Sequence, residues 1–453
     1  MRVLKFGGTS VADAEAIGRL VAIVAGRRGS RTVVVSALGG VTDRLLGLAE
    51  AAVVDPAAAK TGLDAVLARH FEVADALRNP TARQMIDAML RGIGQGAQRT
   101  LDAITSSGVP SPALLDKLLA CGELWSSRLV AAFLADAGVH AQWIDARHLV
   151  RTDDAHGHAV PDFAATERSV RRLVRPALAL DRVVVAGGFI GSAPDGATTT
   201  LGRGGSDYTA ALLGACLMAD EIEIWTDVDG VLSADPRVVA RARVLAALSY
   251  EDAETLATFG AKVLHPKTIE PAAARDIPVR VLNSSRPGQP GTRIDGSGGD
   301  AGYAAVASRA GLALLELSAR DRTGDGTFAS RALQVLSEAR VRVIVGEIHK
   351  DRVTVAVESG FDLDALRARV SGFADLSAKS GLSAVCAVGG RLASDPRLVT
   401  SAFALLDDRR LHLVARPGGS SALAVVVDDR DVHDLVARLH DTFTAAPAQA
   451  VAS

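Results

Sequence analysis

Short, mostly apolar, strand-like runs recur along the N-terminal part of the chain, and longer stretches with helical periodicity separate them. The apolar runs fall at residues 3–6, 32–36, 141–144, 182–186, 221–225 and 278–282. The helical stretches include residues 12–28, 41–53, 63–79, 111–136, 206–218 and 250–259. Apolar strands that alternate with helices are typical of a mostly parallel sheet covered by helices on both faces. We therefore predict an α/β fold here and expect ligands beyond the carboxyl ends of the strands.

The overall composition limits the class of protein. The 453 residues are enough for two or three domains, and 48% hydrophobic and 23% charged residues are ordinary values for a globular protein. A formal net charge of −2 argues against a nucleic-acid or membrane-surface binder. Three cysteines without metal-type spacing, and no long apolar run, indicate a cytoplasmic protein that is neither exported nor membrane-spanning. The histidines form no metal-binding pattern, so we predict no metal ligands in the chain.

The C-terminal part has a different organisation. A stretch rich in Gly, Pro, Ser and Asp at residues 284–302 has the composition of a linker. Beyond it, short strands are expected at 312–318, 342–348, 352–358, 383–389, 411–415 and 423–428, and helices at 328–339, 362–373, 398–407 and 431–441. Two β-α-β-β units in this order predict a pair of small α+β modules.

The segment Met1–Val11 joins the first strand to the first helix. Gly7 and Gly8 allow backbone N–H groups to approach an anion, and the following helix start offers further donors. Lys5 adds a compact positive charge that can follow a phosphoryl group. Because no lysine of the chain stands in a G-x-x-x-x-G-K-[S/T] context, this is a phosphate-binding turn other than a Walker A loop.

The segment Gly202-Arg-Gly-Gly-Ser-Asp207 opens a helix and combines three glycines with charged side chains. Arg203 offers a two-pronged donor for a carboxylate, and Asp207 can accept from an ammonium group. The plainer alternative is a helix start in which Ser206 or Asp207 merely caps. Capping does not explain an arginine between glycines, so we favour a binding site.

Three further segments are less specific. Glu123 lies near the start of an amphipathic helix, where a carboxylate is also explained by the helix dipole. Ser36 and Thr42 bracket a Gly-Gly pair after a strand, which is a common loop. Thr226, Asp227 and Arg237 lie in a polar loop that could face a nucleotide, although its Asp-Gly and Asp-Pro pairs are ordinary turn formers.

Taken together, these motifs resemble the aspartate kinases, in particular the monofunctional, lysine-sensitive type. The likeness rests on Lys5-Phe-Gly-Gly-Thr-Ser-Val11, Gly122-Glu-Leu124, Gly188-Phe-Ile-Gly191, Thr200-Leu-Gly-Arg-Gly-Gly-Ser-Asp-Tyr-Thr209, Trp225-Thr-Asp227 and Phe259-Gly-Ala-Lys-Val-Leu-His-Pro266. The resemblance implies an amino-acid-kinase domain at 1–293, a linker and first strand of the second ACT domain at 294–310, and ACT domains at 311–380 and 381–445. The strand at Tyr303–Ser308 would complete the second ACT domain, with the first inserted after it.

The resemblance also implies a reaction and its residues. It implies transfer of the γ-phosphoryl group of ATP to the β-carboxylate of L-aspartate, in a cytoplasmic homodimer formed through the ACT domains. The aspartate site would comprise Ser36, Thr42, Glu123, Phe189, Arg203, Ser206 and Asp207, with Lys5, Arg203 and Asp207 as the catalytic residues. ATP, accompanied by Mg²⁺, would be held by Lys5, Gly7, Gly8, Thr226, Asp227, Leu232, Arg237, Lys262 and Val263.

The chain departs from the family pattern at two places. Leu232 stands where related kinases often carry an aromatic residue against the adenine, so stacking becomes aliphatic packing. The usual signatures of the first ACT domain are replaced by Gly326-Thr-Phe-Ala-Ser330, Val341-Arg-Val-Ile344 and His349-Lys-Asp351. An amino-acid effector, lysine or threonine, is implied by the resemblance. Our hypothesis is that lysine inhibits this copy weakly or not at all.

Two other functions remain open from the sequence. A related kinase acting on glutamate, N-acetylglutamate or a similar acid would share the glycine loops, but the segment 200–209 and the paired modules fit it less well. A catalytically silent amino-acid-binding subunit would have no use for Lys5, Glu123, Arg203 and Asp207 together.

Overall fold

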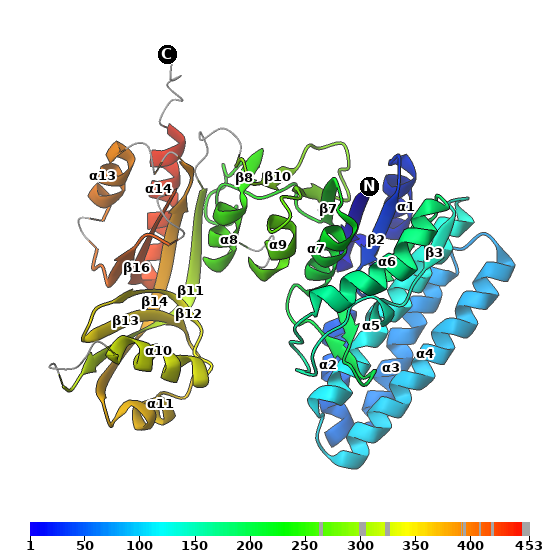
Figure 1. Ribbon diagram of the computed structural model, residues 1–453, viewed down its shortest axis with the longest axis horizontal. Helices are drawn as coiled ribbons and strands as arrows, with labels where there is room; N and C mark the ends of the chain where they lie inside the picture. The colour runs from blue at the N-terminus through cyan, green and yellow to red at the C-terminus, as the bar shows by residue number, and fades with distance from the viewer. Residues whose placement is uncertain are drawn as a thin grey trace. The chain divides into compact units, whose positions relative to one another are not determined.

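A computed structural model describes residues 1–261, 266–298, 305–321, 327–390, 392, 396–406, 409–417 and 421–445. The chain forms two compact units, which we describe separately. The first comprises residues 1–230 and 267–296, and the second comprises 231–266 and 297–453. Figure 1 shows the elements of both units along the chain.

A mostly parallel sheet organises the first unit. Its strands are β1 (Arg2–Phe6), β2 (Arg31–Val35), β3 (Ala141–Trp143), β4 (Val183–Gly187), β7 (Glu221–Thr226), β9 (Val279–Asn283) and β10 (Thr292–Asp295). They lie in the order β3-β4-β2-β1-β7-β9-β10. All neighbours from β3 to β9 pair in parallel, and β10 pairs antiparallel with β9. The carboxyl ends of β1, β2, β4 and β7 therefore meet along one edge of the sheet.

Helices cover both faces of this sheet. One side has α1 (Ala14–Gly26), α2 (Val41–Val54), α3 (Pro56–Ala74), α4 (Pro80–Ser107) and α5 (Pro112–Asp136). The antiparallel pair of long helices α3 and α4 stands out in Figure 1. The other side has α6 (Phe163–Ala179) and α7 (Gly205–Leu217), and α7 packs on β1, β2 and β7. The short elements η1 (Gly8–Val11), η2 (Ala146–His148), β5 (Ile190–Ser192), β6 (Thr198–Thr200) and α9 (Pro266–Ala273) complete the unit.

Strand alternation decides which side chains of β1 face each helical layer. Leu4 and Phe6 belong to the core beneath α1 and α5, whereas Val3 lies towards Gly214 of α7. Because successive side chains of a strand point to opposite faces, Lys5 shares the α7 side with Val3. The alternation of side chains along β1 therefore directs Lys5 towards the N-terminus of α7.

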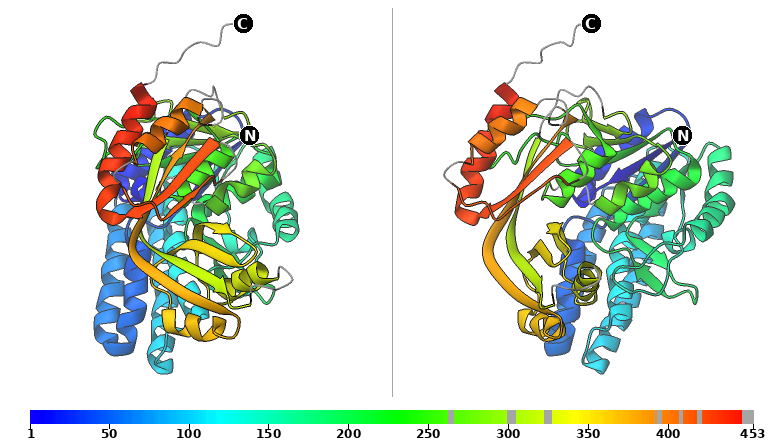
Figure 2. Two further views of the ribbon diagram at one scale, coloured as in Figure 1. Left: turned by 90° about the vertical axis from the view of Figure 1, so that its left-hand side faces the viewer. Right: turned by 60° about the vertical axis from the view of Figure 1, so that its left-hand side comes forward.

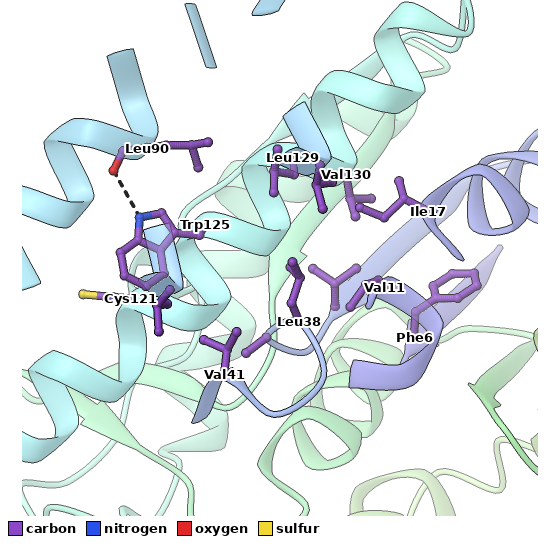
Figure 3. Packing of buried hydrophobic residues seen from close by; sticks show 14 of the residues in the cluster. Phe6, Val11, Ile17, Leu38, Val41, Leu90, Cys121, Trp125, Leu129 and Val130 are labelled. Atoms are coloured by element: carbon purple, nitrogen blue, oxygen red, sulfur yellow. Dashed lines mark hydrogen bonds between the residues drawn. The ribbon is translucent and has the colours of Figure 1, made fainter. Parts of the chain in front are cut away.

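The core between the sheet and α1–α5 is closely packed. Figure 3 shows side chains from β1, α1, α4 and α5 that converge in it. The fully buried indole of Trp125 donates from Nε1 to the carbonyl oxygen of Leu90 at 3.2 Å, which ties α5 to α4. Helix α5 is long and apolar enough to cross a membrane, but 67% of its most apolar window is buried inside the protein. Its apolar character is therefore explained by its place in the core.

The second unit contains an antiparallel sheet in the order β12-β13-β11-β14-β16-β15. Its strands are β11 (Ala305–Ala319), β12 (Val343–Ile348), β13 (Arg352–Glu358), β14 (Ala374–Val388), β15 (Leu413–Ala415) and β16 (Ala422–Asp428). Its helices include α8 (Tyr250–Thr258), α10 (Phe328–Glu338), α11 (Leu363–Val370), α13 (Pro396–Ala404) and α14 (Val432–Ala445), and it also has β8 (Ala247–Ser249) and η4 (Asp429–Asp431). The long strands β11 and β14 run side by side and curve along their length (Figure 2).

The six strands predicted for the first unit are all present, within two residues at each end. Helices α4 and α6 were not predicted, and the helix expected at 63–79 is α3, which begins at Pro56 and ends at Ala74. The strand expected at 383–389 begins instead at Ala374, as part of β14. The strand expected to enter the second module and the one expected at 312–318 form the single strand β11. Tyr303 lies outside the described residues.

Candidate active site

The turn after β1 is in close contact with the turn after β2. The N–H of Gly39 donates to the carbonyl oxygen of Gly8 at 3.0 Å. A Cβ added to Gly8 would lie 3.1 Å from the carbonyl oxygen of Ala37. Glycine therefore lets the two loops approach at the carboxyl edge of the sheet.

Lys5 forms an ion pair at the same edge. Its Nζ lies 2.6 Å from Oδ1 of Asp207, and both side chains are largely buried. Asp207 stands in the first turn of α7, whose N-cap is Gly204 in the left-handed conformation, with no side-chain cap. The simple capping role considered for Ser206 and Asp207 is therefore wrong. Asp207 instead holds the lysine at the end of β1.

The loop after β4 is pressed against the start of α7. A Cβ added to Gly188 would lie 2.6 Å from Cα of Ser206, so only glycine fits. Phe189 has a φ of 66°, an uncommon conformation for a residue with a side chain. Its N–H donates to Oγ1 of Thr209 at 3.1 Å. These contacts fix the position of the Phe189 backbone beside α7.

Glu123 lies in the middle of α5 and not near its start, so the helix-dipole explanation for this residue is wrong. Its Oε1 accepts from the N–H of Ala37 at 3.1 Å, while the buried Oε2 has no hydrogen-bond partner among the described residues. Burial raises the pKa of the carboxyl group to about 8, although the Ala37 hydrogen bond and the charge of Lys5 act in the opposite direction. A positive charge placed beside the carboxyl group would lower this pKa and favour the ionised form.

One cavity of about 760 Å³ brings these side chains together. Its lining includes every residue predicted for the substrate site, together with Lys5: Ser36, Thr42, Glu123, Phe189, Arg203, Ser206 and Asp207. Arg203 is exposed and forms no ion pair within the part of the chain that the structure describes. The cavity therefore offers a free guanidinium group, a buried carboxyl group and an ion-paired lysine.

The comparisons with known proteins agree with this arrangement. Residues 1–283 match the profile of the amino acid kinase family. The lysine-sensitive aspartokinase 3 of Escherichia coli (strain K12) is 36% identical over 450 residues, covering 97% of this chain and 98% of that protein. This chain belongs to the aspartokinases. Members of the family phosphorylate the β-carboxylate of L-aspartate with ATP, so the protein is a phosphotransferase with a carboxyl group as acceptor.

Two solved structures are similar to this aspartokinase over nearly its whole length. E. coli aspartokinase III in complex with aspartate and ADP (R-state) has a TM-score of 0.87 and 34% identity, covering 98% of this chain and 99% of that chain. The same enzyme with lysine and aspartate (T-state) has a TM-score of 0.78 and 33% identity, with the same coverage. The predicted fold class, a kinase domain followed by ACT domains, is thereby confirmed.

The aspartokinase cavity also contains a hydrogen-bond cluster that the sequence did not reveal. The fully buried carboxylate of Asp116 on α5 accepts from Oγ1 of Thr200 at 2.5 Å and from the N–H of Gly157 at 3.1 Å. Nδ1 of His156 lies 2.7 Å from its Oδ2. Asp116 therefore holds the 153–160 loop and the end of β6 against α5. The sequence offered no reason to assign a role to His156, because no local sequence pattern connects it with Asp116.

The residues predicted for ATP are less fully described. In the first unit, Thr226 ends β7 and its Oγ1 donates to Oδ1 of Asp227 at 3.1 Å. In the second unit, Leu232 forms a β-bridge with Val244, and the exposed Arg237 pairs with Asp235 at 2.6 Å. Lys262 and Val263 lie outside the described residues. The grouping of these residues around one nucleotide stays a prediction.

Proposed function

We propose that the 760 Å³ cavity is the aspartate site and that its residues have the roles predicted above. L-Aspartate has two carboxylates and one ammonium group. The cavity offers the complementary set: the unpaired Arg203, the buried Oε2 of Glu123 and the Lys5–Asp207 pair. The free oxygen of Glu123 is the observation that carries the proposal, because a buried carboxyl oxygen without a partner is costly unless a ligand satisfies it.

The charges suggest an orientation for the substrate. Arg203 would bind a carboxylate with its guanidinium fork. The ammonium group would lie against Glu123 and lower the pKa of that carboxyl group from about 8, because an adjacent positive charge favours the ionised form. The hydroxyl groups of Ser36, Thr42 and Ser206 would donate to the remaining carboxylate oxygens.

Catalysis would then depend on the positioning of the two substrates more than on proton transfer. The β-carboxylate is ionised at neutral pH and needs no strong base. One of its oxygens forms a bond to the γ-phosphorus while the bond from that phosphorus to the β–γ bridging oxygen breaks, giving 4-phospho-L-aspartate and ADP. Lys5, with Gly7 and Gly8 beside it, would neutralise the charge of the transferred group.

ATP would arrive as its Mg²⁺ complex. The described residues contain no group of three His, Cys, Asp or Glu side chains able to hold a metal ion, and the carboxylate of Asp207 is already paired with Lys5. When bound, Mg²⁺ neutralises phosphate charge. The nucleotide itself would contact Thr226, Asp227, Leu232, Arg237, Lys262 and Val263.

The second unit would supply regulation. We assign the kinase domain to 1–293, the linker and entering strand to 294–310, and the ACT domains to 311–380 and 381–445. Dimers would form through the ACT domains in the cytoplasm, with lysine or threonine as candidate effector. The altered segments of the first ACT domain support our hypothesis of weak lysine inhibition, which strong inhibition at low lysine concentration would refute.

The first experiment measures ADP release with ATP, Mg²⁺ and L-aspartate, with the acyl phosphate trapped by hydroxylamine. We expect aspartate-dependent hydroxamate from the wild-type protein. Glutamate and N-acetylglutamate serve as comparison substrates, and lysine and threonine are titrated in the same assay. Turnover with another acid but none with aspartate would retain the fold and overturn the assigned substrate.

A further inference from the structure

A second cavity of about 310 Å³ lies between α4, α5 and η2, away from the proposed aspartate site. Three of the residues that line it are cationic, namely Lys117, Arg128 and Arg147, and no acidic residue is among the described lining residues. Cavities lined by one sign of charge concentrate ions of the opposite sign.

The two arginines of this second cavity are held in place. The guanidinium carbon of Arg128 lies 3.6 Å from the centre of the Trp143 ring, and its NH1 group lies 3.1 Å from Sδ of Met89. Arg147 is held by a two-pronged ion pair with Asp145, in which Nε donates to Oδ1 at 3.0 Å and Nη2 donates to Oδ2 at 2.7 Å. Fixed guanidinium groups lose little entropy when they bind an anion, so this geometry suits a ligand better than flexible surface arginines do.

Among the described residues, one of the three cations has an ion-pair partner. Lys117 and Arg128 form no ion pair among the described residues, whereas Arg147 is paired with Asp145. Burial lowers the pKa of the Arg128 guanidinium, and the charge of Arg147 acts in the same direction while Asp145 opposes it. An anion in this cavity would relieve the uncompensated positive charge.

The rest of the lining is mostly apolar or small and leaves room. It includes Met89 and Ile93 of α4 and Leu124 of α5. Gly96 of α4 also lines the cavity, and a Cβ added there would meet nothing nearer than 3.9 Å. A ligand with an anionic end and an apolar body fits such a lining better than a bare inorganic ion does.

The cavity lies on a separate face of α5 from the aspartate site. Lys117, Cys121, Leu124 and Arg128 follow one another at helical spacing along this face. Asp116, Leu119 and Glu123 form the face that lines the larger cavity. We propose that the α4–α5 cavity is a second binding site, specific for a small organic anion bearing a phosphate or carboxylate group. Binding there does not depend on the proposed reaction.

Phenyl phosphate is a suitable probe, because it combines a dianion with a small apolar ring. Isothermal titration calorimetry of the full-length protein should show one site per chain. Lys117→Met keeps an unbranched side chain of similar length but removes its charge, and should weaken binding about tenfold, as expected for the loss of one charged hydrogen bond. Gly96→Leu fills the cavity and should abolish binding while favouring the helix.

Two control variants locate the binding. Lys60→Met removes an exposed lysine of α3 and should leave binding unchanged. Lys5→Met alters the larger cavity and should also leave it unchanged. Thermal unfolding of each variant checks that it is folded. No binding by the wild-type protein, loss of binding only in Lys5→Met, or equal binding by the wild type, Lys117→Met and Gly96→Leu would each overturn the proposal.

Discussion

Helix α5 lines two cavities with opposite arrangements of charge. On one face, Glu123 brings a buried carboxyl group to a cavity where the cation Lys5 is already paired with Asp207. On the other face, Lys117 and Arg128 are cations without an ion pair among the described residues. The comparison teaches that the larger cavity suits a molecule with charges of both signs, whereas the smaller suits an anion.

The largest expected effect is the difference in kcat between substitution of Lys5 in one cavity and of Lys117 in the other. Lys5→Ala removes the charge that we propose neutralises the transferred phosphoryl group, and kcat should fall by about 10³-fold with a much smaller rise in KM for aspartate. Lys117→Ala, on the other face of α5, should leave kcat unchanged. Steady-state kinetics of both variants measures the difference. A preserved kcat in Lys5→Ala would exclude the assigned role.

The pH dependence of stability tests the buried carboxyl group. The pKa of Glu123 is raised by burial from 4.5 to about 8, so between these pH values the folded state retains a proton that the unfolded state has released. The free energy of unfolding of the ligand-free wild type should therefore fall as pH rises across this range, by several kcal/mol in all. Glu123→Gln has no carboxyl group at this position and should not show this fall.

Denaturant unfolding of the wild type and Glu123→Gln at several pH values measures this difference. The variant should gain stability relative to the wild type as pH rises from 5 to 8, and its KM for aspartate should rise about tenfold because a charged contact is lost. Parallel stability curves would show that Glu123 is not the titrating group.

Two substitutions compare a glycine packed closely against α7 with a glycine of α4 that has open space around it. Gly188→Ala places a Cβ 2.6 Å from Cα of Ser206, so the start of α7 must shift. We expect a loss of about 2–3 kcal/mol in stability and a marked loss of activity. Gly92→Ala, in α4, meets no atom within 4 Å and should gain about 1 kcal/mol. Thermal unfolding and kinetics would show both, and an unchanged Gly188→Ala protein would contradict the close packing described.

The smallest expected effect is on the stability of a variant at Asp145, the residue that holds Arg147 beside the second cavity. Hydrogen bonds from Arg147 hold the pKa of the Asp145 carboxyl group below its ordinary value, against the opposing effect of burial, which is the largest single influence. A depressed pKa contributes stability above the ordinary value of 3.8 that is lost as pH falls below it. Asp145→Asn should therefore cost about 2 kcal/mol at pH 7 and less in acid. Chemical unfolding at pH 7 and pH 3 checks this, and an equal cost at both would refute it.

The alternation of apolar strands with helices was enough to predict the parallel sheet, because buried parallel strands have a recognisable composition. Helix α4 was missed although Asn79 and Pro80 are a good helix start, with the Asn79 side chain accepting from two N–H groups. Glu123 could not be distinguished from a dipole-compensating residue, since its function depends on burial. Asp116 and His156 meet 40 residues apart along the chain, which no local pattern predicts.

The strand β11 has a consequence for movement within the second unit. Its first part pairs with the last part of β14, and its remainder pairs with both β14 and β13. Each long strand has 15 residues, roughly 50 Å at about 3.3 Å per residue, and the register shifts between Arg309 and Leu314 without ending the ladder. The two halves of the sheet therefore share a backbone, and Gly311 and Gly381, both at positive φ, lie where the register shifts. A tilt of one half relative to the other would therefore bend or twist β11 and β14 at this point.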